Sequence, residues 1–325
     1  MTRPDLQVSN DNITLVPITS FEGPVLEFNF PSLHIGVAEY REGPTGCTVF
    51  YFPTDATSVI DVRGGNPGTI MGSTAEDGEV SAIVFAGGSI YGLEAATGVS
   101  AQLLAQHNYH GIFSVRGAII YDYGPRQNAI YPDKNLGRAA LKASQSGIFP
   151  LGAKGAGRSA TVGKFLTEPY KSEAAGQGGA FYQWENTKVA VFTVVNAEGA
   201  IADREGNIVR GHFNTQTGKR FRVNAVLNIQ PQLQEQITPS AENTTLTLIV
   251  TNQKTDIHVL RQLAKSVHSS MSRAIYPFHA ISDGDILFAV TTNEVTEQHL
   301  NPYLLSYVAS ELAWEAVLRC FENDT

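Results

Sequence analysis

Short apolar runs separated by glycine-rich turns dominate the first third of the chain. Residues 33–40 and 47–52 are rich in β-branched and aromatic side chains, and Glu42-Gly43-Pro44-Thr45-Gly46 between them has the composition of a turn. These runs predict paired strands. Residues 82–86 form a further apolar run that ends at Gly87-Gly88-Ser89, and the apolar residues that follow recur at helical spacing. This order predicts strand, glycine turn and helix, and it argues against an all-helical protein.

Later apolar segments are dense in β-branched residues but lack alternation. They comprise residues 117–121, 189–195, 245–250 and 286–291. Continuous runs of this kind are typical of strands that are buried on both faces. Two helical stripes, within residues 257–271 and 305–320, can cover such strands. The pattern therefore predicts a layered α/β fold, with an irregular glycine-rich loop over residues 151–179 and a polar surface connection over residues 224–242.

Composition and charge narrow the class of protein. The chain has 325 residues, of which 42% are hydrophobic and 17% charged, and no Pro/Ser-rich linker divides it, so we expect one domain over residues 1–325. A net charge of −8 without a basic run argues against nucleic-acid or acidic-membrane partners. The segment 1–16 carries Asp5, Asn10, Asp11 and Asn12 where a signal peptide needs an apolar stretch, and no apolar run reaches about 18 residues, which predicts a cytoplasmic protein without a membrane span.

Neither the cysteines nor the acidic motif predicts a metal site. Cys47 and Cys320 lie far apart without CxxC spacing, so we expect reduced residues in the core. Asp283-Gly284-Asp285 lacks the further ligands that a cation requires and, on its own, fits a turn before a strand. No metal or organic cofactor is expected.

Three other motifs have ordinary explanations when they are considered alone. The glycine turns at residues 63–68 and 87–92 match neither GxGxxG nor a Walker pattern, which favours tight strand-to-helix packing over phosphate binding. His268-Ser269-Ser270 with His279 is a weak match to a serine triad. Asn243-Thr244-Thr245 fits a glycosylation sequon or simply the start of a strand.

Ordered blocks along nearly the whole chain carry a family resemblance. They include Val62-Arg63-Gly64-Gly65, Tyr91-Gly92-Leu93-Glu94-Ala95, Tyr131-Pro132-Asp133-Lys134, Asn243-Thr244-Thr245, Val267-His268-Ser269-Ser270-Met271 and Asp283-Gly284-Asp285. With these blocks the chain resembles the autoprocessing amidases related to L-aminopeptidase/D-esterase, and among them the endo-type 6-aminohexanoate-oligomer (nylon oligomer) hydrolases. The resemblance implies a four-layer αββα sandwich of N-terminal nucleophile type, made as one precursor and cut into chains 1–243 and 244–325.

The resemblance also implies a set of site residues. Thr244 would become the nucleophile after the bond to Asn243 is cut, with Lys164 and Asn196 beside it and Tyr121 helping to polarise the substrate carbonyl. The Asn196 amide and the Tyr121 phenol are hydrogen-bond donors of the kind that a tetrahedral oxyanion requires.

Two aspartates complete this set, since Asp283 and Asp285 would orient the amine and hydroxyl of Thr244. A threonine hydroxyl needs a nearby base, and an α-amine with a pKa of about 8 can act as one. Lys164 would favour the neutral form of that amine. In the first cut no free amine exists, so we expect Asp283, Asp285 or a water molecule to take the proton.

The resemblance points to an amide substrate: a short peptide, an oligoamide or 6-aminohexanoate oligomers. It further implies a homo-oligomer, a tetramer of cleaved protomers. Two alternatives remain open at this stage: an acyltransferase of the arginine-biosynthesis type, and an uncleaved binding protein that retains the fold without the chemistry.

Overall fold

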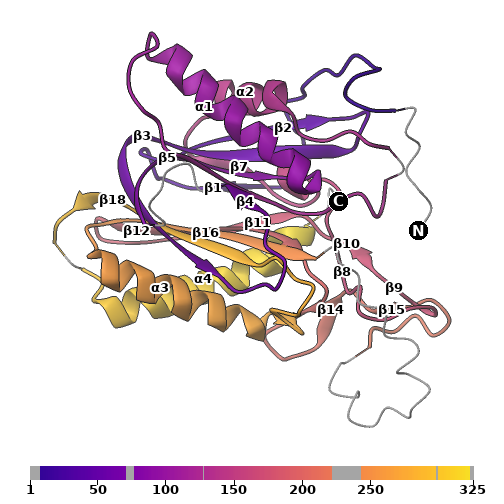
Figure 1. The fold of residues 1–325 in the computed structure, drawn as a ribbon. Helices are drawn as coiled ribbons and strands as arrows, with labels where there is room; N and C mark the ends of the chain where they lie inside the picture. The colour runs from indigo at the N-terminus through magenta and orange to yellow at the C-terminus, as the bar shows by residue number, and fades with distance from the viewer. Residues whose placement is uncertain (1–7, 71–76, 127, 222–242, 298, 323–325) are drawn as a thin grey trace.

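Two β-layers lie between two pairs of helices in the computed structural model of the chain (Figure 1), which describes residues 8–70, 77–126, 128–221, 243–297 and 299–322. One β-layer contains β2 (His34–Tyr40), the first part of β3 (Thr45–Val62), β5 (Gly78–Ala86), β6 (Val115–Ile119) and β4 (Thr69–Ile70). The other contains the last part of β3, then β18 (Ile286–Val295), β16 (Thr244–Gln253), β12 (Thr187–Asn196) and β11 (Gln177–Trp184). The helices α1 (Glu94–Gln106) and α2 (Lys134–Lys142) cover the first layer, and α3 (Ile257–Ser270) and α4 (Pro302–Leu318) cover the second.

The long strand β3 joins the two layers. Its first residues pair with β2 and β5, whereas residues 57–62 pair with β18. The register with β5 shifts between Tyr51 and Ala56, where the strand passes from one layer to the other. The expectation of a strand that ends at Phe52 was therefore wrong, because Pro53 lies at this irregularity and does not end the strand.

Three apolar cores separate the four layers, as expected for an αββα sandwich. The middle core, between the β-layers, contains Phe50 and Phe192, whose ring centroids are 5.3 Å apart. Along β16, Leu246 and Leu248 face this middle core, while Ile249 faces the core under α3 and α4. Because both faces of β16 are buried, its sequence shows no polar alternation, and the prediction of doubly buried strands is confirmed.

Two parallel strand pairs are each joined through a helix. The β5–β6 pair is joined through α1, and the β16–β18 pair is joined through α3. Asp256, at the start of α3, caps the helix by accepting a hydrogen bond from the His258 N–H. Since β16 and β18 are parallel and β12 is antiparallel to β16, the starts of β16 and β18 and the end of β12 meet at one edge of the sheet.

Short two- and three-stranded sheets form outside this main sheet. They are β1 (Val25–Glu27) with β7 (Ile148–Pro150), β8 (Thr161–Val162) with β10 (Glu173–Ala174), β9 (Tyr170–Lys171) with β15 (Phe213–Asn214), and β13 (Ala200–Ala202) with β14 (Ile208–Arg210) and β17 (Ile275–Tyr276). Residues 151–176 thus contain only short strands and one 3-10 turn, which fits the irregular loop expected there, although β11 begins at Gln177 within the expected range. The surface connection predicted over residues 224–242 lies outside the described residues.

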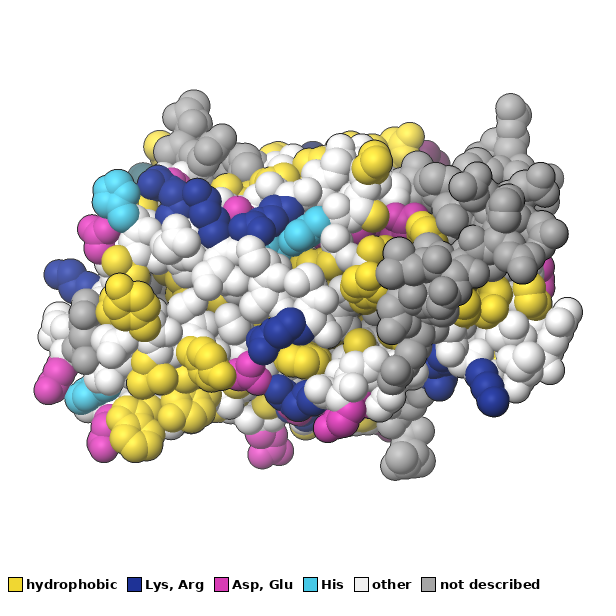
Figure 2. All heavy atoms as spheres, turned by 90° about the horizontal axis from the view of Figure 1, so that it is seen from below, with side chains coloured by type: hydrophobic (Ala, Val, Ile, Leu, Met, Phe, Trp, Pro, Cys, Tyr) yellow, Lys and Arg dark blue, Asp and Glu magenta, His cyan; other side chains and the backbone are white. Residues whose placement is uncertain are grey.

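Acidic, basic and apolar side chains are interspersed over the face that carries α3 and α4 (Figure 2). On α4 the ring of Trp314 contacts the guanidinium groups of Arg204 and Arg273 at 5.1 and 4.7 Å. Cys47 and Cys320 are buried free thiols, as expected, and burial raises the pKa of both. No helix in the described parts of the chain is long and apolar enough to cross a membrane.

Candidate active site

Thr244 is the first residue of β16 and lies at the sheet edge where three strands meet. In the antiparallel register Thr244 is opposite Asn196, the last residue of β12. The preceding residue, Asn243, forms a parallel bridge with Asp283 just before β18. Strand pairing alone therefore brings three of the predicted site residues, Asn196, Thr244 and Asp283, together at one edge.

Two hydrogen bonds converge on the carbonyl oxygen of Asn243. The Thr244 hydroxyl donates to this oxygen at 2.5 Å, and the backbone N–H of Gly284 donates to it at 2.8 Å. The Asn243 side-chain amide donates to Ser282 Oγ at 3.2 Å, and Ser282 Oγ donates to Glu198 Oε2 at 2.6 Å. Asn243, the residue before Thr244, is thus held through both its carbonyl oxygen and its side-chain amide.

Lys164 and Asn196 form one hydrogen-bonded group beside Thr244. Lys164 Nζ donates to both the backbone oxygen and Oδ1 of Asn196, each at 3.0 Å. The Thr161 N–H also donates to Asn196 Oδ1 at 3.0 Å, and Asn196 Nδ2 donates to the Tyr121 carbonyl oxygen at 2.9 Å. The structure thus brings Lys164, Asn196 and Tyr121 together, and the Asn196 side-chain amide donates to the backbone carbonyl of Tyr121. Their catalytic roles stay predictions.

Asp285 is fully buried and accepts three hydrogen bonds. Its Oδ1 accepts from the Thr245 N–H at 2.7 Å, and its Oδ2 accepts from the ring Nδ1 and backbone N–H of His279 at 2.8 and 3.2 Å. Asp285 therefore contacts the residue after the proposed nucleophile. In the described part of the chain, neither Asp285 nor Asp283 hydrogen-bonds to the hydroxyl of Thr244.

Asp283 is also fully buried, but it has a different environment. Its carboxylate accepts from the backbone N–H groups of Ala280 and Glu198 at 2.9 and 3.3 Å. Burial and then the negative charge of Asp285 raise the pKa of Asp283 to about 7, with a smaller contribution from Glu198. Two neighbouring aspartates thus have unlike surroundings, an arrangement common at catalytic sites.

Close backbone contacts explain the glycines that the sequence shows near this edge. A Cβ on Gly64 would lie 2.2 Å from the Asp283 oxygen and 2.3 Å from the Asp285 nitrogen. A Cβ on Gly92 would lie 1.8 Å from the Gly87 oxygen. Both glycine motifs therefore serve close packing, in agreement with the explanation favoured from sequence.

Tyr121 lines two cavities. The smaller, of about 130 Å³, is lined by Asn66, Pro67, Gly68, Ser89, Ile90, Ile119, Tyr121, Asn243 and Thr244. The larger, of about 480 Å³, is lined by Tyr121, Gly124, Pro125, Thr161, Lys164, Leu166, Glu168, Tyr170, Lys171 and Ser172. Of these two, only the larger cavity has charged side chains in its lining. Thr244 lines the smaller cavity, Lys164 lines the larger one, and Tyr121 lines both.

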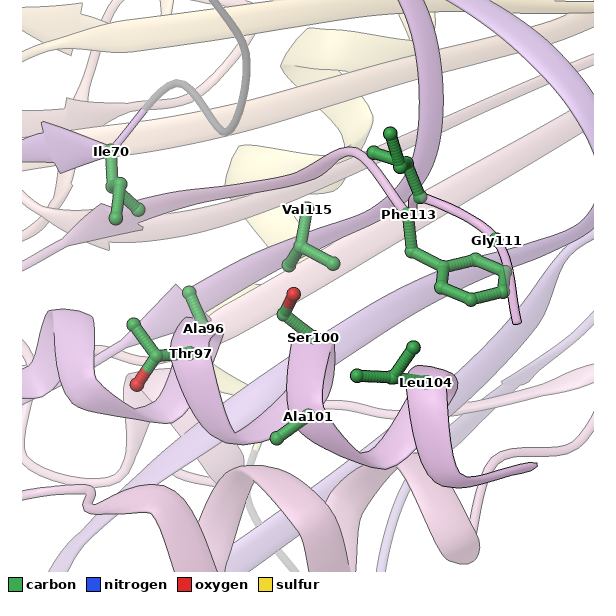
Figure 3. Close-up of a pocket in the computed structure, with 10 residues that line it drawn as sticks. Ile70, Ala96, Thr97, Ser100, Ala101, Leu104, Gly111, Phe113 and Val115 are labelled. Atoms are coloured by element: carbon green, nitrogen blue, oxygen red, sulfur yellow. The ribbon is translucent and has the colours of Figure 1, made fainter. Parts of the chain in front are cut away.

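A further pocket, between α1 and the edge of the first β-layer, is drawn in Figure 3. It has a volume of about 450 Å³, and Leu104, Phe113 and Val115 are among its apolar lining residues. No titratable side chain lines it, so it offers no acid, base or charged ligand-binding group.

Three polar residues of the site had no role in the sequence-based prediction. Glu198 and Ser282 hold Asn243, and His279 holds Asp285, although His279 had been considered only as a triad member. Their proximity depends on loop conformations that no residue spacing reveals. The described residues contain no group of three or more His, Cys, Asp and Glu side chains that could hold a metal ion.

The serine–histidine arrangement considered from sequence does not form. His268 Nδ1 contacts Asp61 Oδ2 at 2.8 Å. The hydroxyls of Ser269 and Ser270 donate to the backbone oxygens of Lys265 and Val267. The weak match to a triad thus reflects helix-surface serines next to a buried histidine.

Comparisons with known proteins agree with this architecture. Residues 30–323 match the model of peptidase family S58. The chain is 43% identical to the 6-aminohexanoate-oligomer endohydrolase of Agromyces sp. (strain KY5R) and 42% identical to that of Paenarthrobacter ureafaciens, in both cases over 95% of this chain and 89% of the relative. Among solved structures, the L-aminopeptidase D-Ala-esterase/amidase from Ochrobactrum anthropi, described as a variant of the Ntn hydrolase fold, has a TM-score of 0.62 at 16% identity and covers 93% of this chain and 88% of its own. A Burkholderia β-aminopeptidase has a TM-score of 0.60 at 17% identity, covering 92% and 88%.

The layered fold is that of the N-terminal nucleophile hydrolases, and the protein is a hydrolase of amide bonds. More specifically, the chain belongs to peptidase family S58.

Proposed function

We propose that the chain cuts itself between Asn243 and Thr244 and then uses Thr244 to hydrolyse amide bonds in short oligoamides, 6-aminohexanoate oligomers among them. The observation that carries this proposal is the placement of the Thr244 hydroxyl and the Gly284 N–H on the Asn243 carbonyl oxygen. Both groups lie at the atom that becomes negatively charged when a nucleophile adds to this carbonyl.

In the first reaction, Thr244 Oγ adds to the carbonyl carbon of Asn243, and its proton passes to Asp283, Asp285 or a water molecule, which later gives it to the Thr244 nitrogen. The Gly284 N–H stabilises the oxyanion. The bond between this carbon and the Thr244 nitrogen then breaks, and the nitrogen leaves as an amine after gaining a proton. Water opens the resulting ester, which releases the carboxylate of Asn243 and restores the hydroxyl. Because the attack is intramolecular, correct orientation supplies much of the rate.

In turnover, the freed amine of Thr244 accepts the proton of its own hydroxyl as Oγ attacks a substrate amide. Lys164 lies beside Asn196, which is opposite Thr244 in the sheet. The positive charge of Lys164 favours the neutral form of the Thr244 amine. Tyr121 and the Asn196 amide are the proposed donors to the oxyanion. Asp285 orients the backbone at Thr245.

The two cavities support an extended amide substrate. A scissile amide near Tyr121 would place one part of the substrate in the small cavity beside Thr244 and the other part in the larger one beside Lys164. The relatives named as 6-aminohexanoate-oligomer endohydrolases make linear oligoamides the first substrates to assay. The proposal includes one domain over residues 1–325 and a cytoplasmic location. It also includes a tetramer of cleaved protomers, whose mass light scattering can measure.

The substitution Thr244→Ala tests the nucleophile. We expect the wild-type chain to give two masses, corresponding to residues 1–243 and 244–325, in intact mass spectrometry under denaturing conditions. The Thr244→Ala chain should fold but stay at full length, and Thr244→Ser should still cut, because a serine hydroxyl can add to the same carbonyl.

Cleavage of Thr244→Ala at the same bond would refute the nucleophile. A wild-type chain that stays whole on incubation would favour a binding protein without chemistry. With cleaved enzyme, release of free acid from an oligoamide supports hydrolysis. Transfer of the acyl group to an added amine in preference to water would instead favour the acyltransferase alternative.

A further inference from the structure

A histidine outside the proposed catalytic set provides two of the three hydrogen bonds to Asp285. Both the ring Nδ1 and the backbone N–H of His279 contact Asp285 Oδ2, at 2.8 and 3.2 Å. His279 has a φ of +60°, a left-handed conformation that few residues other than glycine adopt without strain. Strained residues that persist are held by their surroundings and cluster at functional sites.

Those surroundings form a continuous series of contacts behind His279. The ring centroids of His268, from α3, and His279 are 4.5 Å apart in an edge-to-face arrangement. The ring centroid of Phe278 lies 3.9 Å from that of His279. His268 Nδ1 contacts Asp61 Oδ2 at 2.8 Å, and Asp61 accepts from Arg63 Nε at 2.6 Å. Within the described residues, the buried Nε2 atoms of both histidines have no hydrogen-bond partner, so each ring interacts with an aspartate through Nδ1 alone.

Asp285 connects this series to both sides of the bond proposed to be cut. Its Oδ1 accepts from the N–H of Thr245, the residue after the nucleophile. Gly284, the residue before Asp285, donates its N–H to the Asn243 carbonyl oxygen. A displaced Asp285 would therefore move both the start of β16 and the donor on the carbonyl.

We propose that His279 is a positioning residue that holds the Asp285 carboxylate, and with it the Gly284 N–H, in the arrangement required for self-cleavage and turnover, while His268 and Asp61 hold His279. This inference rests on the proposed function. The charged and titratable groups that face His279 are Asp285 on one side and His268, with Asp61 behind it, on the other. Burial lowers the pKa of His268, which favours a neutral ring next to His279.

Two substitutions at His279 separate positioning from backbone strain. Glycine adopts the left-handed conformation freely but offers no side-chain donor, whereas asparagine tolerates that conformation and carries an N–H donor. We expect His279→Gly to slow self-cleavage in freshly translated chain at least about tenfold, since a misplacement of reacting groups near 1 Å can cost about a hundredfold in rate. The rate of His279→Asn should stay within about threefold of wild type. Per mole of cleaved chain, kcat should follow the same order, while KM changes less than about twofold.

Addition of imidazole to His279→Gly should recover part of the lost rate, a readout that a merely structural role would not give. Equal rates for His279→Gly and wild type, or an equal loss in the Gly and Asn variants, would overturn the inference. If His279→Gly does not fold by circular dichroism, His279→Ala, which has neither a side-chain donor nor a charge, replaces it in the comparison. Thr244→Ala is measured in parallel: cleavage there refutes the proposed function itself, whereas no cleavage there together with a normal rate in His279→Gly refutes only the positioning role.

Discussion

Buried polar side chains at the start of β16 and β18 each have specific partners, and these partners give neighbouring residues unlike properties. Asp285 accepts three hydrogen bonds, one of them from the ring of His279. Within the described residues, Asp283 accepts from two backbone N–H groups alone, and its pKa is raised to about 7 by burial and the charge of Asp285. Residue type alone would have made the two aspartates equivalent, so the sequence could suggest that both belong to the site but not how they differ.

At the scale of a single residue, the buried ring of His212 predicts that the free energy of unfolding depends on pH. It is fully buried, neither ring nitrogen has a hydrogen-bond partner among the described residues, and burial lowers its pKa to about 4. The unfolded chain therefore takes up this proton near pH 6.5, before the folded chain does. Its contribution to stability is present above pH 6.5 and is lost as the pH falls toward 4, by up to about 3 kcal/mol.

The test is urea unfolding of Thr244→Ala chains, which stay in one piece if the proposal holds. His212→Asn suits the left-handed backbone at this position, where φ is +48°. Between pH 7.5 and 4.5 the free energy of unfolding should fall less in the Asn variant than in the chain that retains His212. Parallel pH profiles would show that His212 does not titrate in this way.

At the scale of elements, the site depends on a close approach between the start of β16 and the loop before β18. A Cβ on Gly284 would lie 2.7 Å from both Thr244 Oγ1 and the Asn66 oxygen, closer than real Cβ contacts. We expect Gly284→Ala to slow self-cleavage at least about tenfold, because the hydroxyl or the loop must shift. The time course of cleavage, followed by mass spectrometry, measures this.

Gly218→Asn is the control for this change, since a Cβ there meets nothing within 4 Å, asparagine tolerates the backbone φ of +67° at this position, and Gly218 lies outside residues 243–285. Its cleavage rate should equal that of wild type. If Gly284→Ala also cleaves at the wild-type rate, the tight approach of the two elements has no part in the reaction.

The elements themselves were largely predictable, with exceptions that have physical reasons. Continuous β-branched runs identified β12, β16 and β18, because both faces of these strands are buried. The length of β3 was missed, since Pro53 normally argues against a strand and here falls at the irregularity between the layers. The site residues Lys164, Asn196, Thr244 and Asp285 have no common spacing, so only family resemblance, and not periodicity, could group them.

For the whole molecule, stability depends on the aromatic core between the two β-layers. The ring of Phe192 lies 4.9 Å from that of Phe149, 5.3 Å from Phe50 and 5.6 Å from Phe28. In the Thr244→Ala chain we expect Phe192→Ala to lower the free energy of unfolding by about 3–5 kcal/mol, since it removes a buried ring and leaves a cavity. Phe192→Leu should cost less. A loss under about 1 kcal/mol for Phe192→Ala in urea unfolding would contradict this role of the core.

The strand order has a consequence for when the proposed self-cleavage can take place. In the sheet, β16 and β18 from the C-terminal part lie between β12 and β3 from the N-terminal part. Residues 1–243 alone would leave a two-strand gap in their own sheet, so this portion has no complete structure while the ribosome is still synthesising the rest. The Gly284 donor also belongs to the part that is made last. If the chain cuts itself as proposed, cleavage would occur only after synthesis and assembly are finished, and strands from both products would stay paired in one sheet.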